Sequence, residues 1–143
     1  GAPVSGQWAQ EIGADGYAWL AMTLNYAGRE QEALPLFEKA IRLNPLPPAF
    51  YYLNFGHTYR LLERYEGAIA MYKKAAALTP NNIFAHINLA ATYGLIGKEG
   101  EAKASAAEVL RINPKWSLEH YEKTQMAKDK ERLVKALQRA GLK

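Results

Sequence analysis

The stretch PAFYYLNFGHTYRLLERYEGAIAMYKKAAALTPNN, residues 48–82, decides the fold. Its first half predicts an amphipathic helix, because apolar residues recur at steps of three or four: Tyr52, Phe55, Tyr59 and Leu62. Its second half repeats the pattern with Ala68, Ile69, Tyr72, Ala75 and Ala76. The polar residues 63–66 between them predict a tight turn. A single helical hairpin cannot bury its own apolar face, so this one needs neighbours.

The chain supplies these neighbours as two further copies of the unit. Pro45, Pro80 and Pro114 are separated by 35 and 34 residues. Four upstream rows keep the same spacings: Ala33, Ala68 and Ala102; Ala40, Ala75 and Val109; Phe37, Tyr72 and Ala106; Leu20, Phe55 and Leu89. We therefore predict repeats at 14–47, 49–82 and 83–116 within a single domain of residues 1–143.

The ends of the helices follow from the same rows. Each second helix should stop before its corner proline, because proline has no amide donor. Gly28 and Gly97 are expected to end first helices in the left-handed conformation, and Asn82 and Ser117 to cap the helices that follow them. Pro35 falls inside a predicted helix, where a small distortion is expected.

The two ends of the chain lie outside the repeats. In residues 1–13, Trp8, Ala9 and Ile12 fit either the end of an earlier helix or a segment folded back on the first repeat. After residue 116 we expect a short helix and then a last helix over 130–140, with Asp129 as its cap and Gly141 as its stop. One face of that last helix is apolar and the other basic, which is typical of a capping element. The apolar face comprises Leu133, Val134, Leu137 and Ala140, and the basic face Arg132, Lys135 and Arg139.

Composition narrows the possible functions. The 143 residues are 49% hydrophobic and include no cysteine, which removes disulfides, thiol catalysis and thiolate metal sites. No apolar run approaches the ~18 residues of a transmembrane helix, and residues 1–4 lack the features of a signal peptide. We expect a cytoplasmic location. The net charge of +4 is spread too thinly for a nucleic-acid patch, so no nucleic acid is expected as a partner.

The period and its residue rows resemble the tetratricopeptide repeat. The middle repeat carries the motif residues Tyr52, Phe55, Gly56, Tyr59, Ala68, Tyr72, Ala75 and Pro80. The first repeat matches at Tyr17, Leu20, Ala33, Phe37, Ala40 and Pro45, and the third at Leu89, Tyr93, Ala102 and Pro114. This resemblance implies an all-α, right-handed solenoid of three helix–turn–helix repeats with C-terminal capping helices.

The C-terminal tail carries a second resemblance. Residues 113–119 and 133–142 look like the segments that close tetratricopeptide arrays in bacterial signalling proteins, among them proteins with an N-terminal class III adenylate or guanylate cyclase domain or a DNA-binding domain. This implies a fragment of a larger protein active in signal transduction.

Catalytic chemistry has few candidate residues. His57, His86 and His120 lie in different predicted repeats or in the tail, and no paired-carboxylate or His-x-x-x-His spacing appears. His86 takes a core position of its repeat and is interpreted as packing. We predict no enzyme activity, no catalytic residue, no metal site and no cofactor.

The sequence fits a protein-binding function better than a catalytic one. In the resembled family the first helices line a concave groove, and their exposed motif positions correspond here to Trp19, Met22, Tyr26, Phe50, Leu53, Asn54, His57, Arg60, Phe84, Ile87, Asn88 and Ala91. Such an apolar and aromatic surface is typical of a protein interface. The carboxylate clamp of chaperone-adaptor members is not preserved, because only Asn54 of its five positions fits.

Three functions remain open. The favoured one is a non-catalytic protein-interaction scaffold that binds a peptide or helix in the groove. The alternative is a regulatory or self-associating segment of a bacterial cyclase-type signalling protein. The third is a basic surface, formed by Arg132, Lys135 and Arg139, that binds anionic partners. The aromatic residues could instead pack between neighbouring first helices, and the N-terminal segment could itself lie in the groove.

Overall fold

The computed structural model describes residues 7–143, with side chains from residue 12 onward. This part of the chain is entirely helical apart from turns and loops, which confirms the predicted all-α solenoid. Its helices are α1 (Gln7–Tyr26), α2 (Glu30–Leu43), α3 (Ala49–Leu61), α4 (Tyr65–Leu78), α5 (Ile83–Leu95), α6 (Glu99–Ile112), α7 (Leu118–Thr124) and α8 (Lys130–Arg139).

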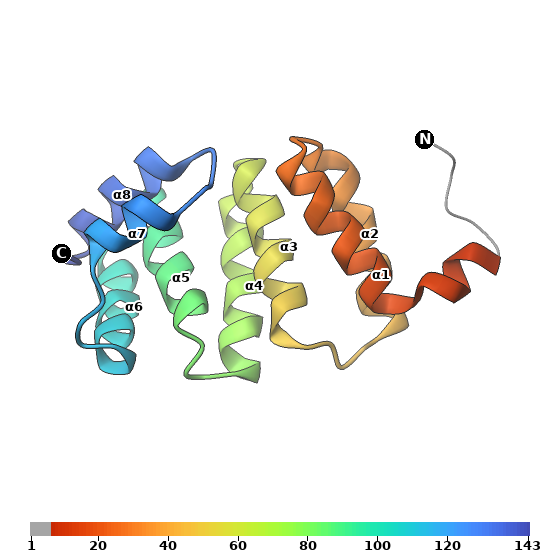
Figure 1. Ribbon diagram of the computed structural model, residues 1–143. Helices are drawn as coiled ribbons and strands as arrows, with labels where there is room; N and C mark the ends of the chain where they lie inside the picture. The colour runs from red at the N-terminus through yellow and green to blue at the C-terminus, as the bar shows by residue number, and fades with distance from the viewer. Residues whose placement is uncertain (1–6) are drawn as a thin grey trace.

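The first six helices form three antiparallel hairpins that stack in chain order (Figure 1). Each first helix packs on its own second helix, and each second helix packs on the first helix of the next hairpin. Helices α1, α3 and α5 also contact one another in sequence and form an inner layer. The tail then turns back, so that α8 packs against α5 and α7 packs against α8.

The helix ends agree with the sequence. The second helices stop at Leu43, Leu78 and Ile112, just before their corner prolines. Gly28 and Gly97 have φ angles of 76° and 77°, the left-handed conformation that ends a helix. The caps also form, because Asn82 Oδ1 accepts from the Phe84 amide and Ser117 Oγ accepts from the His120 amide. Helix α2 continues through Pro35.

Helix α1 is two helical pieces joined at Gly13, whose φ of 69° and ψ of −179° are non-helical. Glycine suits this position because residues with a Cβ rarely adopt such a φ. Ile12, just before the break, is half-buried against the core of the first hairpins. The side chains of Trp8 and Ala9, for which two arrangements were predicted, lie outside the described residues.

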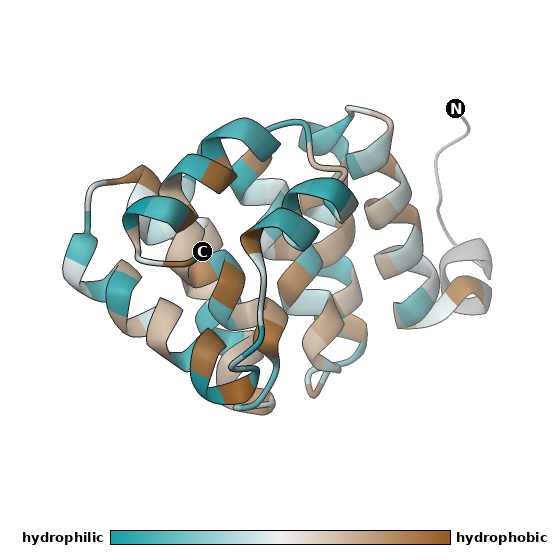
Figure 2. Ribbon diagram, turned by 60° about the vertical axis from the view of Figure 1, so that its left-hand side comes forward, coloured by the Kyte–Doolittle hydropathy of each residue, from teal (hydrophilic) through white to brown (hydrophobic). Residues whose placement is uncertain are grey.

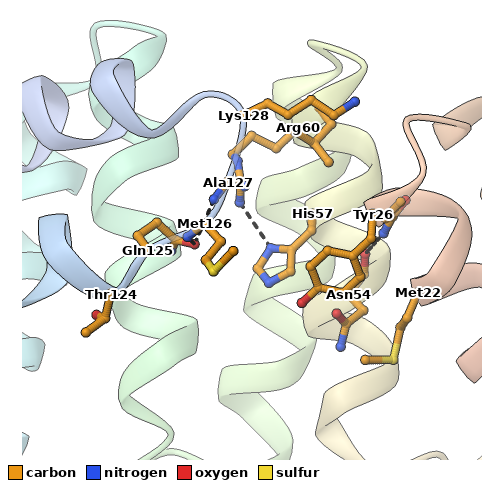
Figure 3. Close-up of a pocket in the computed structure, with 12 residues that line it drawn as sticks. Met22, Tyr26, Asn54, His57, Arg60, Thr124, Gln125, Met126, Ala127 and Lys128 are labelled. Atoms are coloured by element: carbon orange, nitrogen blue, oxygen red, sulfur yellow. Dashed lines mark hydrogen bonds between the residues drawn. The ribbon is translucent and has the colours of Figure 1, made fainter.

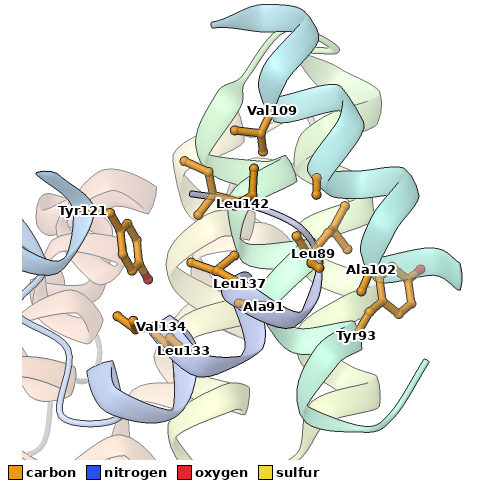
Figure 4. Close-up of a cluster of buried hydrophobic side chains, with 14 of the residues drawn as sticks. Leu89, Ala91, Tyr93, Ala102, Val109, Tyr121, Leu133, Val134, Leu137 and Leu142 are labelled. Atoms are coloured by element: carbon orange, nitrogen blue, oxygen red, sulfur yellow. The ribbon is translucent and has the colours of Figure 1, made fainter. Parts of the chain in front are cut away.

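The core consists of two clusters of buried side chains. One joins α1, α2 and α3 around Tyr17, Phe37 and Phe55. The other runs from α4 to the C-terminus and includes the apolar face of α8, where Leu133 and Leu137 are fully buried (Figure 4). The opposite face of α8 is exposed and polar, as its sequence predicts (Figure 2).

Within residues 7–143 no helix is long and apolar enough to cross a membrane.

Gly56 allows α3 and α4 to pack closely within the middle hairpin. A substitution at this position tests that packing. A Cβ at this position would lie 2.6 Å from Cε1 of the buried Tyr72 ring. We expect Gly56→Ala to lower the free energy of unfolding by about 1–3 kcal/mol, because an overpacked core must shift. The measurement is urea denaturation followed by circular dichroism.

Gly100→Ala is the matched control, because nothing lies within 4 Å of its Cβ position in α6. This change should leave stability equal or raise it by up to about 1 kcal/mol, since alanine favours a helix. Equal effects of the two substitutions would contradict the close packing at Gly56.

Candidate binding groove

By their exposure, the predicted groove residues form three groups: accessible, partly buried and buried. Trp19, Tyr26 and Phe84 are 59%, 82% and 64% exposed. A second set is partly buried and lines the inner surface of α1 and α3: Met22, Phe50, Leu53, Asn54 and His57. Four residues are buried: Arg60, Ile87, Asn88 and Ala91. That the accessible group binds a partner remains a prediction.

The burial in the third hairpin has a physical cause. Helix α8 carries a continuous apolar stripe, and the inner face of α5 is the surface against which it packs. Ile87 and Ala91 of α5 belong to the same buried cluster as Leu133 and Leu137 of α8. At Gly94 the two helices are so close that a Cβ would lie 3.0 Å from the Cβ of Ala136. The tail of the chain therefore fills the third hairpin's share of the groove from Ile87 onward and leaves Phe84 exposed.

Arg60 holds the beginning of α8 against the middle hairpin. Its Nε and Nη2 donate to the two carboxylate oxygens of Asp129 at 2.8 and 3.3 Å. The arginine side chain is 4% exposed and the aspartate 15%, so water screens this ion pair weakly. Asp129 occupies the predicted N-cap position of α8, but its carboxylate caps no amide and binds Arg60 instead. The predicted capping bond was therefore wrong.

The remaining nitrogen of the Arg60 guanidinium organises a small polar network. The two hydrogens of Nη1 are shared among three acceptors: Tyr72 Oη at 2.7 Å, His57 Nδ1 at 3.0 Å and Asn88 Oδ1 at 3.2 Å. Tyr72 in turn lies 2.7 Å from His57 Nδ1. Burial alone would lower the pKa of Arg60, but the Tyr72 oxygen and the Asp129 carboxylate raise it above its ordinary value, so the charge is retained.

Two further ion pairs join the tail to the repeats at the surface. Lys128 donates to Glu30 at 2.6 Å, and Arg132 donates to Glu63 at 3.0 Å. Both cations are more than half exposed, so each pair contributes little to stability. Arg132 also lies over the ring of Tyr65. One of the three residues of the predicted basic surface is thus already paired within the chain.

A pocket of about 310 Å³ opens where α1, α3 and the tail meet (Figure 3). Helix α1 contributes Met22, Asn25 and Tyr26, helix α3 contributes Asn54, His57, Arg60 and Leu61, and the tail contributes residues 124–128. The mouth carries two very exposed side chains, Tyr26 and Met126. The pocket combines apolar walls with a polar floor, which is typical of ligand sites.

His57 lies in this floor as a neutral imidazole. Burial and the positive charge of Arg60 lower its pKa from 6.5 to about 3. The hydroxyl of Tyr72 stays protonated, because burial raises its pKa above the ordinary value. The floor therefore offers hydrogen-bonding groups at neutral pH with no titration between pH 5 and 8.

No group of three or more His, Asp or Glu side chains that could hold a metal ion occurs in the described part of the chain. His86 Nε2 donates to the Pro80 carbonyl oxygen at 2.8 Å, and His120 is exposed on α7. The three histidines are thus not brought together.

The sequence did not indicate the part that the tail plays in the groove. Residues 124–128 line the pocket and Asp129 closes the ion pair, although all of them lie more than 60 positions after Arg60. The only signal was an acidic residue before a helix, and that signal favours a cap as readily as an ion pair.

The comparisons with known proteins agree with this architecture. A family profile described as "TPR repeat" matches residues 56–97, and one described as "Tetratricopeptide repeat" matches residues 14–45. Together these matches span more than half of the chain. The chain is also 36% identical over 90 residues to "Uncharacterized protein ycf37" of Cyanophora paradoxa. That match spans 63% of this chain and 52% of the relative, so the chain corresponds to about half of that protein.

Solved structures that share this fold include the following three, and each is less than 25% identical in sequence to this chain. The second TPR domain of human RPAP3, in complex with the HSP70 peptide SGPTIEEVD, has a TM-score of 0.72 at 18% identity and covers 94% of this chain and 100% of that one. MamA has a TM-score of 0.69 at 20% identity, covering 89% and 75%. PilW, a type IV pilus biogenesis factor, has a TM-score of 0.72 at 22% identity, covering 92% and 58%. None of these supports the predicted link to cyclase-type signalling proteins.

The buried ion pair gives the first test of the site. Asp129→Asn should lower the free energy of unfolding by about 3 kcal/mol, because it leaves the Arg60 charge buried without a counterion. Glu119→Gln is the control, since the Glu119–Lys123 pair is exposed and its loss should cost less than about 0.5 kcal/mol. Chemical denaturation measures both, and a loss at Asp129 no larger than at Glu119 would contradict the role of the pair.

The neutral state of His57 gives the second test. As the pH falls below 6.5 the unfolded chain gains a proton at this residue, whereas the folded chain does not until about pH 3. Stability should therefore decline on acidification through this window, by roughly 1 kcal/mol per pH unit from this residue. The decline should be smaller in His57→Asn, whose amide oxygen can replace Nδ1 as an acceptor. Identical slopes of unfolding free energy against pH in the two proteins would refute the assignment.

Proposed function

The chain carries tetratricopeptide repeats, and from that premise we propose that it is a non-catalytic protein-interaction scaffold that binds a peptide segment in its groove. The segment lies along α1, α3 and the exposed start of α5, where the groove is open, and ends against the tail. The proposed contact surface is smaller than the groove predicted from the sequence, because it leaves out the residues that α8 covers.

The observation that carries the proposal is the exposed aromatic surface on the inner helices. Trp19 lies on α1, and its ring centroid is 5.9 Å from that of Phe50 on α3. Phe84 stands 64% exposed at the start of α5. Large aromatic side chains bury most of their area in stable proteins, and exposed aromatic side chains are frequent anchors of an interface.

The RPAP3 structure supports peptide binding by analogy, because a domain of the same fold forms a complex with a peptide. The analogy extends to the fold and not to the ligand. That peptide is acidic at its end, whereas Arg60 and Lys128 in this pocket are already paired with acidic residues of the chain.

The test begins with selection of peptides from a displayed library on the purified chain. Binding of a selected peptide is then measured by fluorescence polarisation for Trp19→Ser and for Phe84→Ser. Each loss of an aromatic anchor should weaken binding by about 1.5–3 kcal/mol, roughly ten- to a hundredfold.

Leu78→Ser is the control, because Leu78 is also about half exposed but lies at the end of α4, outside the inner layer. It should leave the affinity unchanged. A library that yields no binder, or binders indifferent to both aromatic substitutions in folded protein, would overturn the proposed function.

A further inference from the structure

The hydrogen bonds of His57 fix the position of its proton. Nη1 of Arg60 lies 3.0 Å from His57 Nδ1, and a guanidinium has only donors. This contact favours Nδ1 as the acceptor. The Tyr72 hydroxyl, which accepts from Arg60, also has its own hydrogen free to donate to Nδ1 at 2.7 Å. Since Nδ1 carries no proton, the ring is neutral and its single N–H is at Nε2.

This Nε2–H has no hydrogen-bond partner among residues 12–143, although Nδ1 has two. His57 is one of the residues that line the pocket, and in Figure 3 its ring stands between Tyr26 and Met126, with one nitrogen turned to Arg60 and the other away from it. The pocket therefore contains a donor whose direction is set from behind by Arg60 and Tyr72.

We propose that the His57 Nε2–H donates to a main-chain carbonyl oxygen of the bound segment, while an apolar side chain of that segment fills the pocket between Tyr26 and Met126. This inference rests on the proposed function and names the chemistry of one contact within it. Arg60 acts as a positioning residue, because it holds the imidazole in this tautomer without contacting the ligand.

The charges around the pocket favour a neutral acceptor over a carboxylate. Arg60 is paired with Asp129, and Lys128 is paired with Glu30. No cation in the pocket wall is left without a partner within the described residues. A carboxylate would lose its hydration here without meeting a net positive charge, whereas a peptide carbonyl needs only the one donor.

The walls of the pocket favour an apolar side chain beside that carbonyl. Met22 and Leu61 form its sides and Met126 its rim, and methionine side chains adapt to aromatic and aliphatic groups alike. Because Met126 belongs to the tail, the site is complete only when the tail lies in place.

The first experiment reads the tautomer directly. In the full chain labelled with ¹⁵N, the imidazole nitrogens of His57 are assigned by NMR at pH 7. We expect the proton on Nε2 and a non-protonated Nδ1. A proton on Nδ1, or an imidazolium ring, would overturn the proposal.

The second experiment measures the preference for a neutral acceptor. N-acetylphenylalanine amide and N-acetylphenylalanine, which differ in an amide against a carboxylate, are titrated separately while the signals of His57, Met22 and Met126 are followed. The amide should shift the His57 Nε2 resonance and the methyl groups of both methionines, and it should bind more tightly than the acid. Tighter binding of the acid, or shifts that bypass His57, would refute the inference.

The variant His57→Asn tests the hydrogen bond to the ligand without disturbing the fold. Its amide oxygen can accept from Arg60 and Tyr72, whereas the donor at Nε2 is lost. Affinity for the amide probe should fall about three- to tenfold with stability close to wild type. His120→Asn, on the exposed face of α7, should change neither. An unchanged affinity in His57→Asn would refute the hydrogen bond.

The outcomes distinguish the two proposals. If library peptides bind through Trp19 and Phe84 but leave the His57 resonances unmoved, the groove function stands and this inference fails. If the probes behave as expected but no library peptide binds, the proposed function fails, and with it the assignment of a peptide segment as the occupant of the pocket.

Discussion

The ion pair between Arg60 and Asp129 is the interaction on which the groove depends. A guanidinium that is 4% exposed cannot be left without a counterion, and the counterion comes from a residue 69 positions later. By satisfying Arg60, Asp129 fixes where α8 begins and where the preceding loop crosses the inner layer. The same guanidinium orients His57, so the ion pair sets both the wall and the floor of the pocket.

Apolar burial and the ion pair make different contributions. The association of α8 with α5 is apolar, with Leu133 and Leu137 fully buried, and this burial supplies most of the stability of the tail. A stripe of this kind tolerates small shifts along the partner helix. The bidentate contact between Arg60 and Asp129 has a defined geometry and selects one register. In this account the tail serves as the cap of the solenoid and as part of its binding surface.

The fold could be predicted from the sequence because the signals that define it act locally and recur in each repeat. Prolines 34 or 35 residues apart, glycines at helix ends and the caps at Asn82 and Ser117 act on neighbouring residues, and all of them appear as predicted. The candidate site was less predictable. Motif positions placed Ile87 and Ala91 in the groove, but motif positions carry no information about what packs on them.

Long-range pairing was the part that the sequence could not reveal. The C-terminal tail carries several acidic residues, and nothing local distinguishes Asp129 from Glu131 as the partner of Arg60. The amphipathic stripe of α8 predicted a buried face but not the helix that would bury it. Both facts depend on the path of residues 113–129, where turns rather than repeats set the direction of the chain.

The central claim, that the tail is a fixed part of the groove, is tested most directly by native-state hydrogen exchange. The free energies of opening are compared for the amides of α8 and of α5. If the tail is integral, the slowest amides of Leu133 to Leu137 exchange with the same opening free energy as those of α5, in one cooperative unit. Exchange in α8 at a free energy several kcal/mol lower than in α5 would show that the tail detaches on its own and would contradict the account.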